Sequence, residues 1–259
     1  MCKKINIRVC AKEYNEKLSA VKRRIIICAG TGCVANGSLK FRDALLKELA
    51  RHNLNINTDL ENEDLKKDSH YVSKSGCQGF CQMGPLVRIE PDGILYTKVQ
   101  AADAEEIVTE TILKGNVVER LLYRSPIDGR HYRGDHDIPF YKRQHRLVLA
   151  NCTIEPASIS EYIARRGYEA AEKAWTAMAP EEVCKVMEDS GLRGRGGGGF
   201  PTGRKWRLTL ASKNDVKYVI CNGDEGDPGA FMDRSVMEGN PHSVLEGMMV
   251  AARAVEASE

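Results

Sequence analysis

Two pairs of cysteines, each within a glycine-rich loop, constrain the fold of this chain more than any other feature of its sequence. Four residues separate Cys28 from Cys33, and three separate Cys77 from Cys81. A fold that brings both loops together would assemble four thiolates, which are ligands for Zn²⁺ or for an iron–sulfur cluster. Zinc sites more often place two residues between paired cysteines, so the wider spacings favour a two-iron cluster in which each pair holds one iron. Zinc binding and buried structural thiols are the alternatives.

Hydrophobic patterning places these loops in an α/β domain. An apolar, β-branched run at 25–29 predicts a buried strand directly before the first cysteine loop. A helix capped by Ser38 and a strand at 54–60 are expected to follow. Two short apolar runs around the turn at 91–93 predict a hairpin, and 102–114 predicts an amphipathic helix. This order of strand, helix, strand, hairpin and helix is that of a thioredoxin-like domain.

Three segments carry weaker patterns. Residues 1–21 are expected to be peripheral, and 71–74 fit either a short helix or an extended turn. Residues 119–150 are irregular and rich in Arg, His, Tyr and Asp, so we expect an extended connector, either solvated or lying as a strap over another domain. We therefore place one domain at 1–118 and a second at 151–259.

The cysteine loops resemble those of a known family. Cys28 and Cys33 follow a strand, and Cys77-Gln-Gly-Phe-Cys81 is followed by Met-Gly-Pro at 83–85. Over residues 20–114 this pattern resembles the thioredoxin-like 2Fe-2S ferredoxins. The resemblance implies that all four cysteines ligate a 2Fe-2S cluster. It also implies a domain that carries one electron at a time and has no substrate pocket of its own.

The second domain contains two loops whose composition suits a nucleotide. The first is a basic glycine loop made of Gly194, Arg195, Gly196, Gly197, Gly198, Gly199, Phe200, Pro201, Thr202, Gly203 and, one residue further, Lys205. Glycine lets the backbone approach a planar ring or a phosphate closely. The second is an acidic loop after a predicted strand at 217–221, with Asn222, Asp224, Glu225 and Asp227. Open α/β sheets bind ligands at the carboxyl ends of their strands, so one nucleotide site is expected. A flexible glycine linker, a calcium loop and a plain acidic turn are the alternatives.

The two loops, at 191–206 and 218–231, resemble those of the flavin-bearing, NADH-oxidising subunit of respiratory complex I, over about residues 120–259. Gly226-Asp227 stands where the respiratory subunit usually has Ser-Glu. Together with the fused ferredoxin, this makes the chain more similar to subunits of NAD(P)-linked iron hydrogenases and formate dehydrogenases. The resemblance implies an α/β domain that binds FMN and NAD(P)H, of which this chain holds the N-terminal part.

The resemblance also implies a role for individual residues. Residues 194–203 would line the FMN and NADH site, with Phe200 stacked on the adenine and Lys205 facing the FMN phosphate and ribityl chain. The acidic-loop residues that would bind FMN are Asn222, Asp224 and Glu225. Asp227 would stand near the nicotinamide, and no side chain would be catalytic because the flavin mediates the reaction. That reaction is hydride transfer between NAD(P)H and FMN, followed by single electrons to iron–sulfur clusters.

Composition excludes several other classes. The 38 Lys and Arg against 36 Asp and Glu give a formal charge of +2, which argues against a nucleic-acid binder. No apolar run reaches the ~18 residues of a membrane span, and no apolar signal-peptide core follows the first lysines. We therefore expect a cytoplasmic protein. Its partners would be other subunits of a hydrogenase or formate dehydrogenase complex, including a small 2Fe-2S subunit.

Two other functions stay open at this point: a stand-alone 2Fe-2S electron carrier without flavin activity, and a zinc-binding adaptor. The family's Cys-x-x-Cys-x-x-Cys motif is absent from this sequence, so a 4Fe-4S cluster is expected only in a missing C-terminal part. The helix expected at 243–256 also ends where an α/β layout should continue with a strand. We expect these residues alone to be inactive in NADH oxidation.

Overall fold

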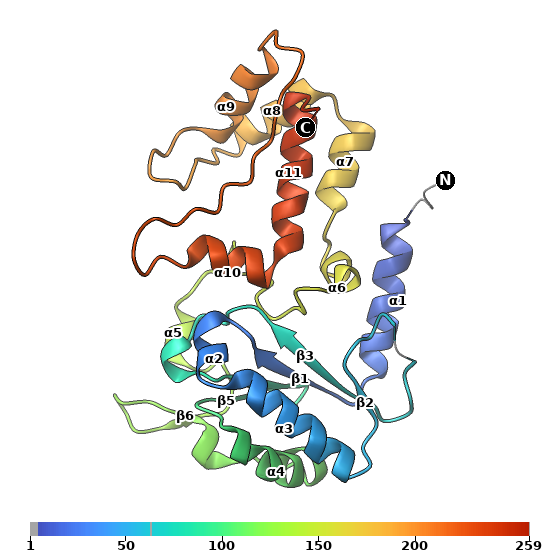
Figure 1. Ribbon diagram of the computed structural model, residues 1–259, viewed down its shortest axis with the longest axis vertical. Coiled ribbons are helices and arrows are strands. Elements are labelled where there is room, and N and C mark those ends of the chain that lie inside the picture. Colours follow the sequence, from blue (N-terminus) through green and yellow to red (C-terminus); the bar gives the residue numbers. More distant parts are fainter. Residues whose placement is uncertain (1–4, 63, 259) are drawn as a thin grey trace.

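The computed structural model describes residues 5–62 and 64–258, and its first half is built on a five-stranded mixed sheet (Figure 1). The strands are β1 (Arg23–Cys28), β2 (Ile56–Asn57), β3 (His70–Ser75), β4 (Val87–Glu90) and β5 (Ile94–Tyr96). They lie in the order β2-β3-β1-β4-β5, with β1 parallel to β3 and antiparallel to β4. This sheet is the core of the thioredoxin-like fold that the element order predicts.

The strand beside β1 is the main local error of the sequence-based expectation. β3 pairs with β1 along its whole length, where the sequence favoured a short helix or an extended turn at 71–74. Tyr71 and Val72 are both 1% exposed, because the strand is covered on both faces. A strand buried on both sides lacks the alternation of polar and apolar residues that marks a strand in sequence. The strand expected at 54–60 is reduced to Ile56–Asn57 at the sheet edge.

Helices cover one face of the sheet, and α3 (Ser38–Arg51) is the longest of them (Figure 1). Phe41 and Leu45 of α3 pack against Ile25 and Ile27 of β1 in the main core. The short helices of this half are α2 (Thr31–Ala35), η1 (Cys81–Met83), η2 (Ala101–Asp103), α4 (Ala104–Glu106), η3 (Ile107–Leu113) and η4 (Glu119–Leu121). The single helix expected at 102–114 is therefore a continuous helical segment with 3₁₀, α and π turns.

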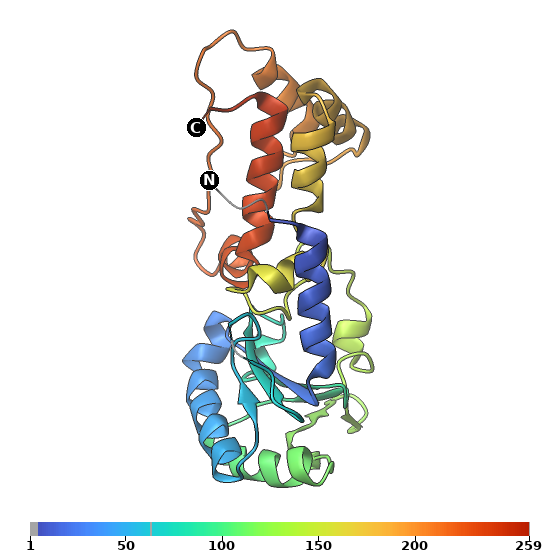
Figure 2. The same cartoon turned by 90° about the vertical axis from the view of Figure 1, so that its right-hand side faces the viewer.

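The opposite face carries α1 (Ile7–Ala20), which runs from the sheet to α6 (Ile159–Ala164) (Figure 2). The described part of the segment expected to be peripheral forms this helix; residues 1–4 lie outside the described residues. Tyr14 is the one buried residue of α1 and packs with Leu60 and Tyr71. A helix that buries so little shows no clear apolar stripe, which explains why its sequence pattern is weak.

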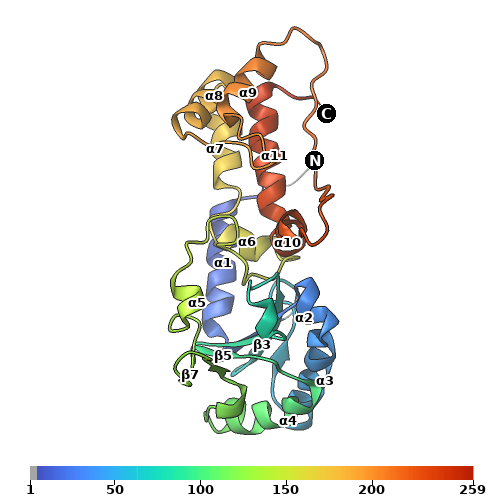
Figure 3. The same cartoon turned by 90° about the vertical axis from the view of Figure 1, so that its left-hand side faces the viewer.

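The second half of the chain consists of helices joined by long extended segments (Figure 3). Its helices are α6, α7 (Glu169–Ala177), α8 (Pro180–Asp189), α9 (Thr202–Leu210), α10 (Met232–Gly239) and α11 (Pro241–Val255). The strand expected at 217–221 is extended but pairs with no strand among the described residues. Val219 packs against the helices, while Tyr218 and Ile220 are exposed. A strand needs a hydrogen-bonded neighbour, and the described residues supply none here.

The connector lies against the first domain as a strap. It contains a small hairpin, β6 (Tyr123–Arg124) with β7 (His131–Tyr132), followed by α5 (Pro139–Lys142). The ring of Phe140 in α5 stacks on Phe80 with 4.7 Å between centroids. Of the two arrangements expected for the connector, the described residues adopt the strap.

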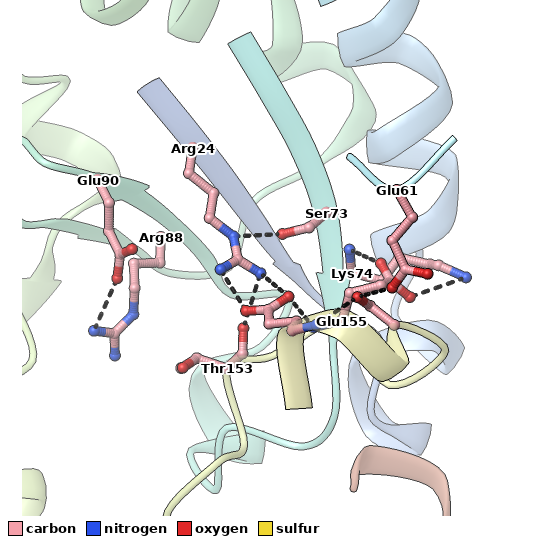
Figure 4. A network of polar contacts seen from close by, with 10 residues as sticks. Arg24, Glu61, Ser73, Lys74, Arg88, Glu90, Thr153 and Glu155 are labelled. Carbon is pink, nitrogen blue, oxygen red and sulfur yellow. Dashed lines mark hydrogen bonds and ion pairs between the residues drawn. The ribbon is translucent and has the colours of Figure 1, made fainter. Parts of the chain in front are cut away.

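A buried ion pair joins the sheet to the second half. Arg24 on β1 and Glu161 on α6 are 4% and 1% exposed, with a shortest N–O distance of 2.6 Å. The Arg24 guanidinium also donates to Ser73 Oγ at 3.0 Å and to the Thr153 carbonyl at 3.4 Å (Figure 4). Because neither charge reaches water, each depends on the other for stabilisation.

His70, the first residue of β3, is buried. Burial, together with the nearby charges of Lys22 and Arg23, lowers its pKa to about 4. In the unfolded chain His70 therefore binds a proton near pH 6.5, whereas in the folded chain it binds one only near pH 4. This contribution to stability is complete above pH 6.5 and is lost as the pH falls toward 4. Between pH 7.5 and pH 5 we expect a loss of about 2 kcal/mol in the free energy of unfolding.

Urea unfolding at the two pH values measures this loss. The His70→Gln variant should have a smaller pH dependence than the wild type. The exposed His52 provides the matched control, because its replacement by glutamine should leave the pH dependence unchanged. Equal pH dependence in wild type and His70→Gln would contradict the assignment.

Candidate functional site

The four predicted cysteine ligands lie where neighbouring strands end. Cys28 is the last residue of β1, and Cys33 lies in α2. Cys77 follows β3 closely, and Cys81 begins η1. Since β1 and β3 are parallel neighbours, their carboxyl ends deliver both cysteine loops to one edge of the sheet.

Close contacts surround several of these sulfur atoms. The sulfur atoms of Cys77 and Cys81 are 3.5 Å apart, and the Gly79 amide donates to the Cys77 sulfur at 3.4 Å. At Gly84 a Cβ atom would come within 2.6 Å of the Cys33 sulfur, so a side chain there would displace the thiol. The glycine of the Met-Gly-Pro sequence after the second cysteine loop thus has a steric reason.

The thiols also change one another's pKa values. A hydrogen bond between Cys28 and Cys33 raises the pKa of the Cys28 thiol, with burial adding to the shift, and lowers the pKa of Cys33. Burial and the neighbouring Cys77 raise the pKa of Cys81 to about 11. Four thiolates brought this close repel each other, and bound metal cations would offset that repulsion.

The four thiols are arranged as two pairs, Cys28 with Cys33 and Cys77 with Cys81. A [2Fe–2S] cluster needs one pair of thiolates on each iron. The four cysteines therefore fit such a cluster, with the backbone amide of Gly79 as a donor to one sulfur.

The glycine loop forms an exposed turn between α8 and α9. Its two arms are held together by hydrogen bonds from the Gly194 amide to the Phe200 carbonyl and from the Thr202 amide to the Leu192 carbonyl, both 2.9 Å. Arg193 also donates to the carbonyl of Gly199 at 3.1 Å. The loop is thus a turn closed by hydrogen bonds between its two arms.

Two glycines of this loop have no explanation within the fold. A Cβ atom at Gly196 or Gly198 would meet nothing within 4 Å, and neither residue has a positive φ. Their neighbours Gly197 and Gly199 do have positive φ values, of 97° and 58°. Because the chain itself would tolerate a side chain at Gly196 and Gly198, a flat ligand pressed against the backbone gives their identity a physical reason.

The aromatic and basic residues around the turn remain accessible. Phe200 is 47% exposed, and the guanidinium of Arg204 lies 5.8 Å from its ring centre. Lys205 is exposed near the start of α9, where the positive end of the helix dipole would favour a phosphate. These residues are placed as a site for an anionic, aromatic ligand requires.

Some side chains of the acidic loop accept backbone hydrogen bonds, and others are exposed to solvent. Both carboxylate oxygens of Glu225 accept backbone N–H bonds from the first turn of α10, from Asp233 at 3.0 Å and Arg234 at 3.1 Å, and these bonds lower its pKa. Asn222 accepts the amide of Asp224 at 2.9 Å. The carboxylates of Asp224 and Asp227 are exposed. Glu225 therefore caps a helix here, whereas the sequence predicts that it binds FMN.

In the view of Figure 1 both loops lie to the left of α11. No hydrogen bond or ion pair between described residues joins them. The structure thus brings the four cysteines together, whereas the glycine loop and the acidic loop have no direct polar contact with each other in the described residues.

Helix α10 connects the acidic loop to the cysteine loops. Its first turn is capped by Glu225, and its last residue, Gly239, meets Gly76, the residue before Cys77. A Cβ atom on Gly76 would lie 2.4 Å from the Cα of Gly239, so the two backbones are in direct contact. A pocket of about 420 Å³ opens beside this contact, lined by Cys77, Cys81 and residues of α10.

Sequence reasoning missed the residues that hold the second cysteine loop from outside. They are Tyr141 and Arg146 in the connector, and Gly239 in α10. Only the dense aromatic and basic composition of 132–146 hinted at a role for the connector, and no spacing in the sequence connects it to the loop.

Two family models each match a part of the chain. Residues 4–111 match the family of thioredoxin-like [2Fe-2S] ferredoxins, and residues 187–259 match the Nuo51 FMN-binding domain. The two matched ranges fall within the two domains expected from the sequence. The boundaries themselves, at 118 and 151, stay predictions.

Several characterised proteins are similar to parts of the chain. The NADP-reducing hydrogenase subunit HndC of Solidesulfovibrio fructosivorans is 54% identical over 118 residues, which are 45% of this chain and 24% of that protein. One of the subunits of NADH-quinone oxidoreductase from Escherichia coli K12 is 43% identical over 104 residues, 40% of this chain and 23% of that protein. A thioredoxin-like [2Fe-2S] ferredoxin from Aquifex aeolicus superimposes with a TM-score of 0.32 and 23% identity, over 42% of this chain and 97% of that one. The chain thus spans about a quarter of the length of the first two of these relatives.

Proposed function

We propose that this chain, which joins a thioredoxin-like [2Fe-2S] ferredoxin domain to a segment of the Nuo51 FMN-binding family, is an electron-transfer component of an NAD(P)H-linked oxidoreductase. In this proposal NAD(P)H and FMN exchange a hydride at the second half, and single electrons pass to the cluster in the first half. The proposal combines a one-electron carrier with a nucleotide site in one polypeptide.

The path of α10 carries this proposal. The helix begins at the acidic loop and ends with Gly239 against Gly76, beside Cys77. A single rigid element therefore runs between the proposed flavin site and the cluster. A stand-alone carrier would have no need for such a contact.

FMN and the residues proposed to hold it have different roles in this function. FMN, when bound, supplies the exchange between two-electron and one-electron steps. The chain's own residues hold and orient it: Gly196 and Gly198 offer bare backbone, and Lys205 offers a charge for its phosphate. Asp224 and Asp227 keep free carboxylates for hydroxyl or amide donors, and Phe200 offers a ring for the adenine of NAD(P)H. Of the three acidic-loop residues proposed to bind FMN, Asn222, Asp224 and Glu225, the last also caps α10.

The partners follow from the same chemistry. A cluster at the end of an electron path must exchange electrons with another centre. We propose the other subunits of a hydrogenase or formate dehydrogenase complex, including a small 2Fe-2S subunit, as the proteins that supply it. Every helix in the described part of the chain is too short or too polar to cross a membrane.

Electron delivery from flavin tests this function directly. The reconstituted 259-residue chain is mixed anaerobically with increasing amounts of chemically reduced FMN, and reduction of the cluster is followed by EPR. We expect a rate that saturates with FMN. In Gly198→Val the half-saturating FMN concentration should rise about tenfold, equivalent to about 1.4 kcal/mol, because a side chain blocks the approach to the backbone.

The matched control is Gly247→Val in α11, another exposed glycine whose Cβ would meet nothing within 4 Å. Its kinetics should equal those of the wild type. A rate that never saturates and that is equal in all three proteins would favour the stand-alone carrier. A colourless protein would favour the zinc-binding adaptor.

A further inference from the structure

The loop between Cys77 and Cys81 is held by a cation from the connector. The Arg146 guanidinium donates from one terminal nitrogen to the Gln78 carbonyl at 2.9 Å. The hydroxyl of Tyr141 donates to the same oxygen at 3.2 Å. Gln78 lies directly between the two cysteines in sequence, so both donors act on the backbone of the cysteine loop itself.

The guanidinium is fixed on its other sides as well. Its second terminal nitrogen donates to the buried Cys152 sulfur at 3.2 Å, and its Nε to the Gln144 side chain at 3.1 Å. The ring of Tyr141 lies beneath it, 4.8 Å from ring centre to guanidinium carbon. A Cβ atom at Gly79 would come within 2.9 Å of Arg146, so the cation rests directly on the loop. No carboxylate is hydrogen-bonded to Arg146 in the part of the chain that the structure describes.

A single peptide group connects this cation to the Cys77 sulfur. The carbonyl of Gln78 and the amide of Gly79 belong to the same peptide unit, and that amide donates to the Cys77 sulfur at 3.4 Å. Donors on a peptide carbonyl polarise the unit and strengthen its N–H as a donor. Arg146 and Tyr141 therefore strengthen the N–H···S bond from the far end of the peptide.

We propose that Arg146 is a positioning residue that raises the reduction potential of the cluster through the Gln78–Gly79 peptide; the inference rests on the [2Fe–2S] assignment in the proposed function. Reduction adds one negative charge to the cluster and its four thiolates. Hydrogen bonds to the sulfurs, and a permanently charged guanidinium nearby, stabilise the more negative state. The connector thus tunes the electron carrier in the first domain.

An EPR-monitored redox titration of the reconstituted 259-residue chain tests the proposal. In Arg146→Gln the ratio of reduced to oxidised cluster at a fixed potential should fall about tenfold, which is about 59 mV for one electron. Tyr141→Phe removes one neutral donor and should shift the ratio in the same direction by less. Arg146→Lys keeps the charge but not the planar fork, so it should lie between Arg146→Gln and the wild type.

Arg143→Gln is the matched control, since it removes the same charge from an exposed position of the same connector. Its midpoint potential should equal that of the wild type. Unchanged midpoints in Arg146→Gln and Tyr141→Phe, or equal shifts in Arg146→Gln and Arg143→Gln, would overturn the inference and leave the proposed function intact. Should Arg146→Gln fail to fold, the midpoint potentials of Tyr141→Phe and Arg146→Lys decide: values equal to the wild type would overturn the inference. A wild-type chain without a [2Fe–2S] spectrum would overturn the cluster assignment as well.

Discussion

Replacing Cys33 or Cys81 with alanine is expected to remove the visible absorption of the anaerobically reconstituted protein and the EPR signal of its reduced form. In the proposed cluster each cysteine is one of two thiolates for an iron, and its neighbours offer no replacement, because no other His, Cys, Asp or Glu completes a group of three ligands in the described residues. The same result is expected at Cys28 and Cys77. Iron and sulfide analysis of the purified variants measures the loss.

Cys184 provides the control. Its thiol is buried in the helical half and bonded to the Ala254 carbonyl at 3.4 Å, far in the fold from the cysteine loops. Cys184→Ala should keep the full spectrum. If all four single alanine variants retained their colour, the ligand assignment would be wrong.

Replacing Glu161 with glutamine is expected to lower the free energy of unfolding by about 3–5 kcal/mol, because it leaves the Arg24 charge buried and unpaired. The pair connects β1 to α6, so both halves should lose stability together. The chain offers a separate probe for each: Trp175 and Trp206 fluoresce in the helical half, and the cluster absorbs in the first domain. Urea unfolding followed by both signals measures the change.

Two comparisons sharpen this test. The exposed pair of Lys185 and Asp189 in α8 is also bonded, at 3.1 Å, yet Asp189→Asn should cost less than about 1 kcal/mol. The double variant Arg24→Met/Glu161→Leu should recover much of the stability that Glu161→Gln loses, since it buries no charge. If Glu161→Gln shifted only the tryptophan signal, the two halves would be independent folding units.

The cluster site could be predicted from sequence because its determinants are local. The spacings of Cys28 and Cys33 and of Cys77 and Cys81 define the two pairs, and the apolar run before Cys28 predicts the strand that ends at the first pair. The glycine loop was recognisable for the same reason: a run of residues without side chains has few uses other than close approach of a ligand.

The errors arose where the outcome depends on partners distant in sequence. β3 shows no alternation because α1 and α3 cover opposite faces of its sheet, and 217–221 remain unpaired because pairing needs a second strand. The sequence also gave no sign that both carboxylate oxygens of Glu225 accept backbone bonds from the start of α10; its role as a flavin ligand stays a prediction.

By itself, then, the sequence predicted the four candidate cysteine ligands, most elements of the first domain apart from α1 and β3, and two loops suited to a nucleotide in the second domain. The tertiary structure alone decided how the two halves are joined: by Arg24 with Glu161, by Gly76 with Gly239, and by Arg146 on the cysteine loop. The physical reason is that a motif encodes contacts within a few residues. These three contacts connect positions 137, 163 and 68 residues apart, and they form only when packing has placed both partners.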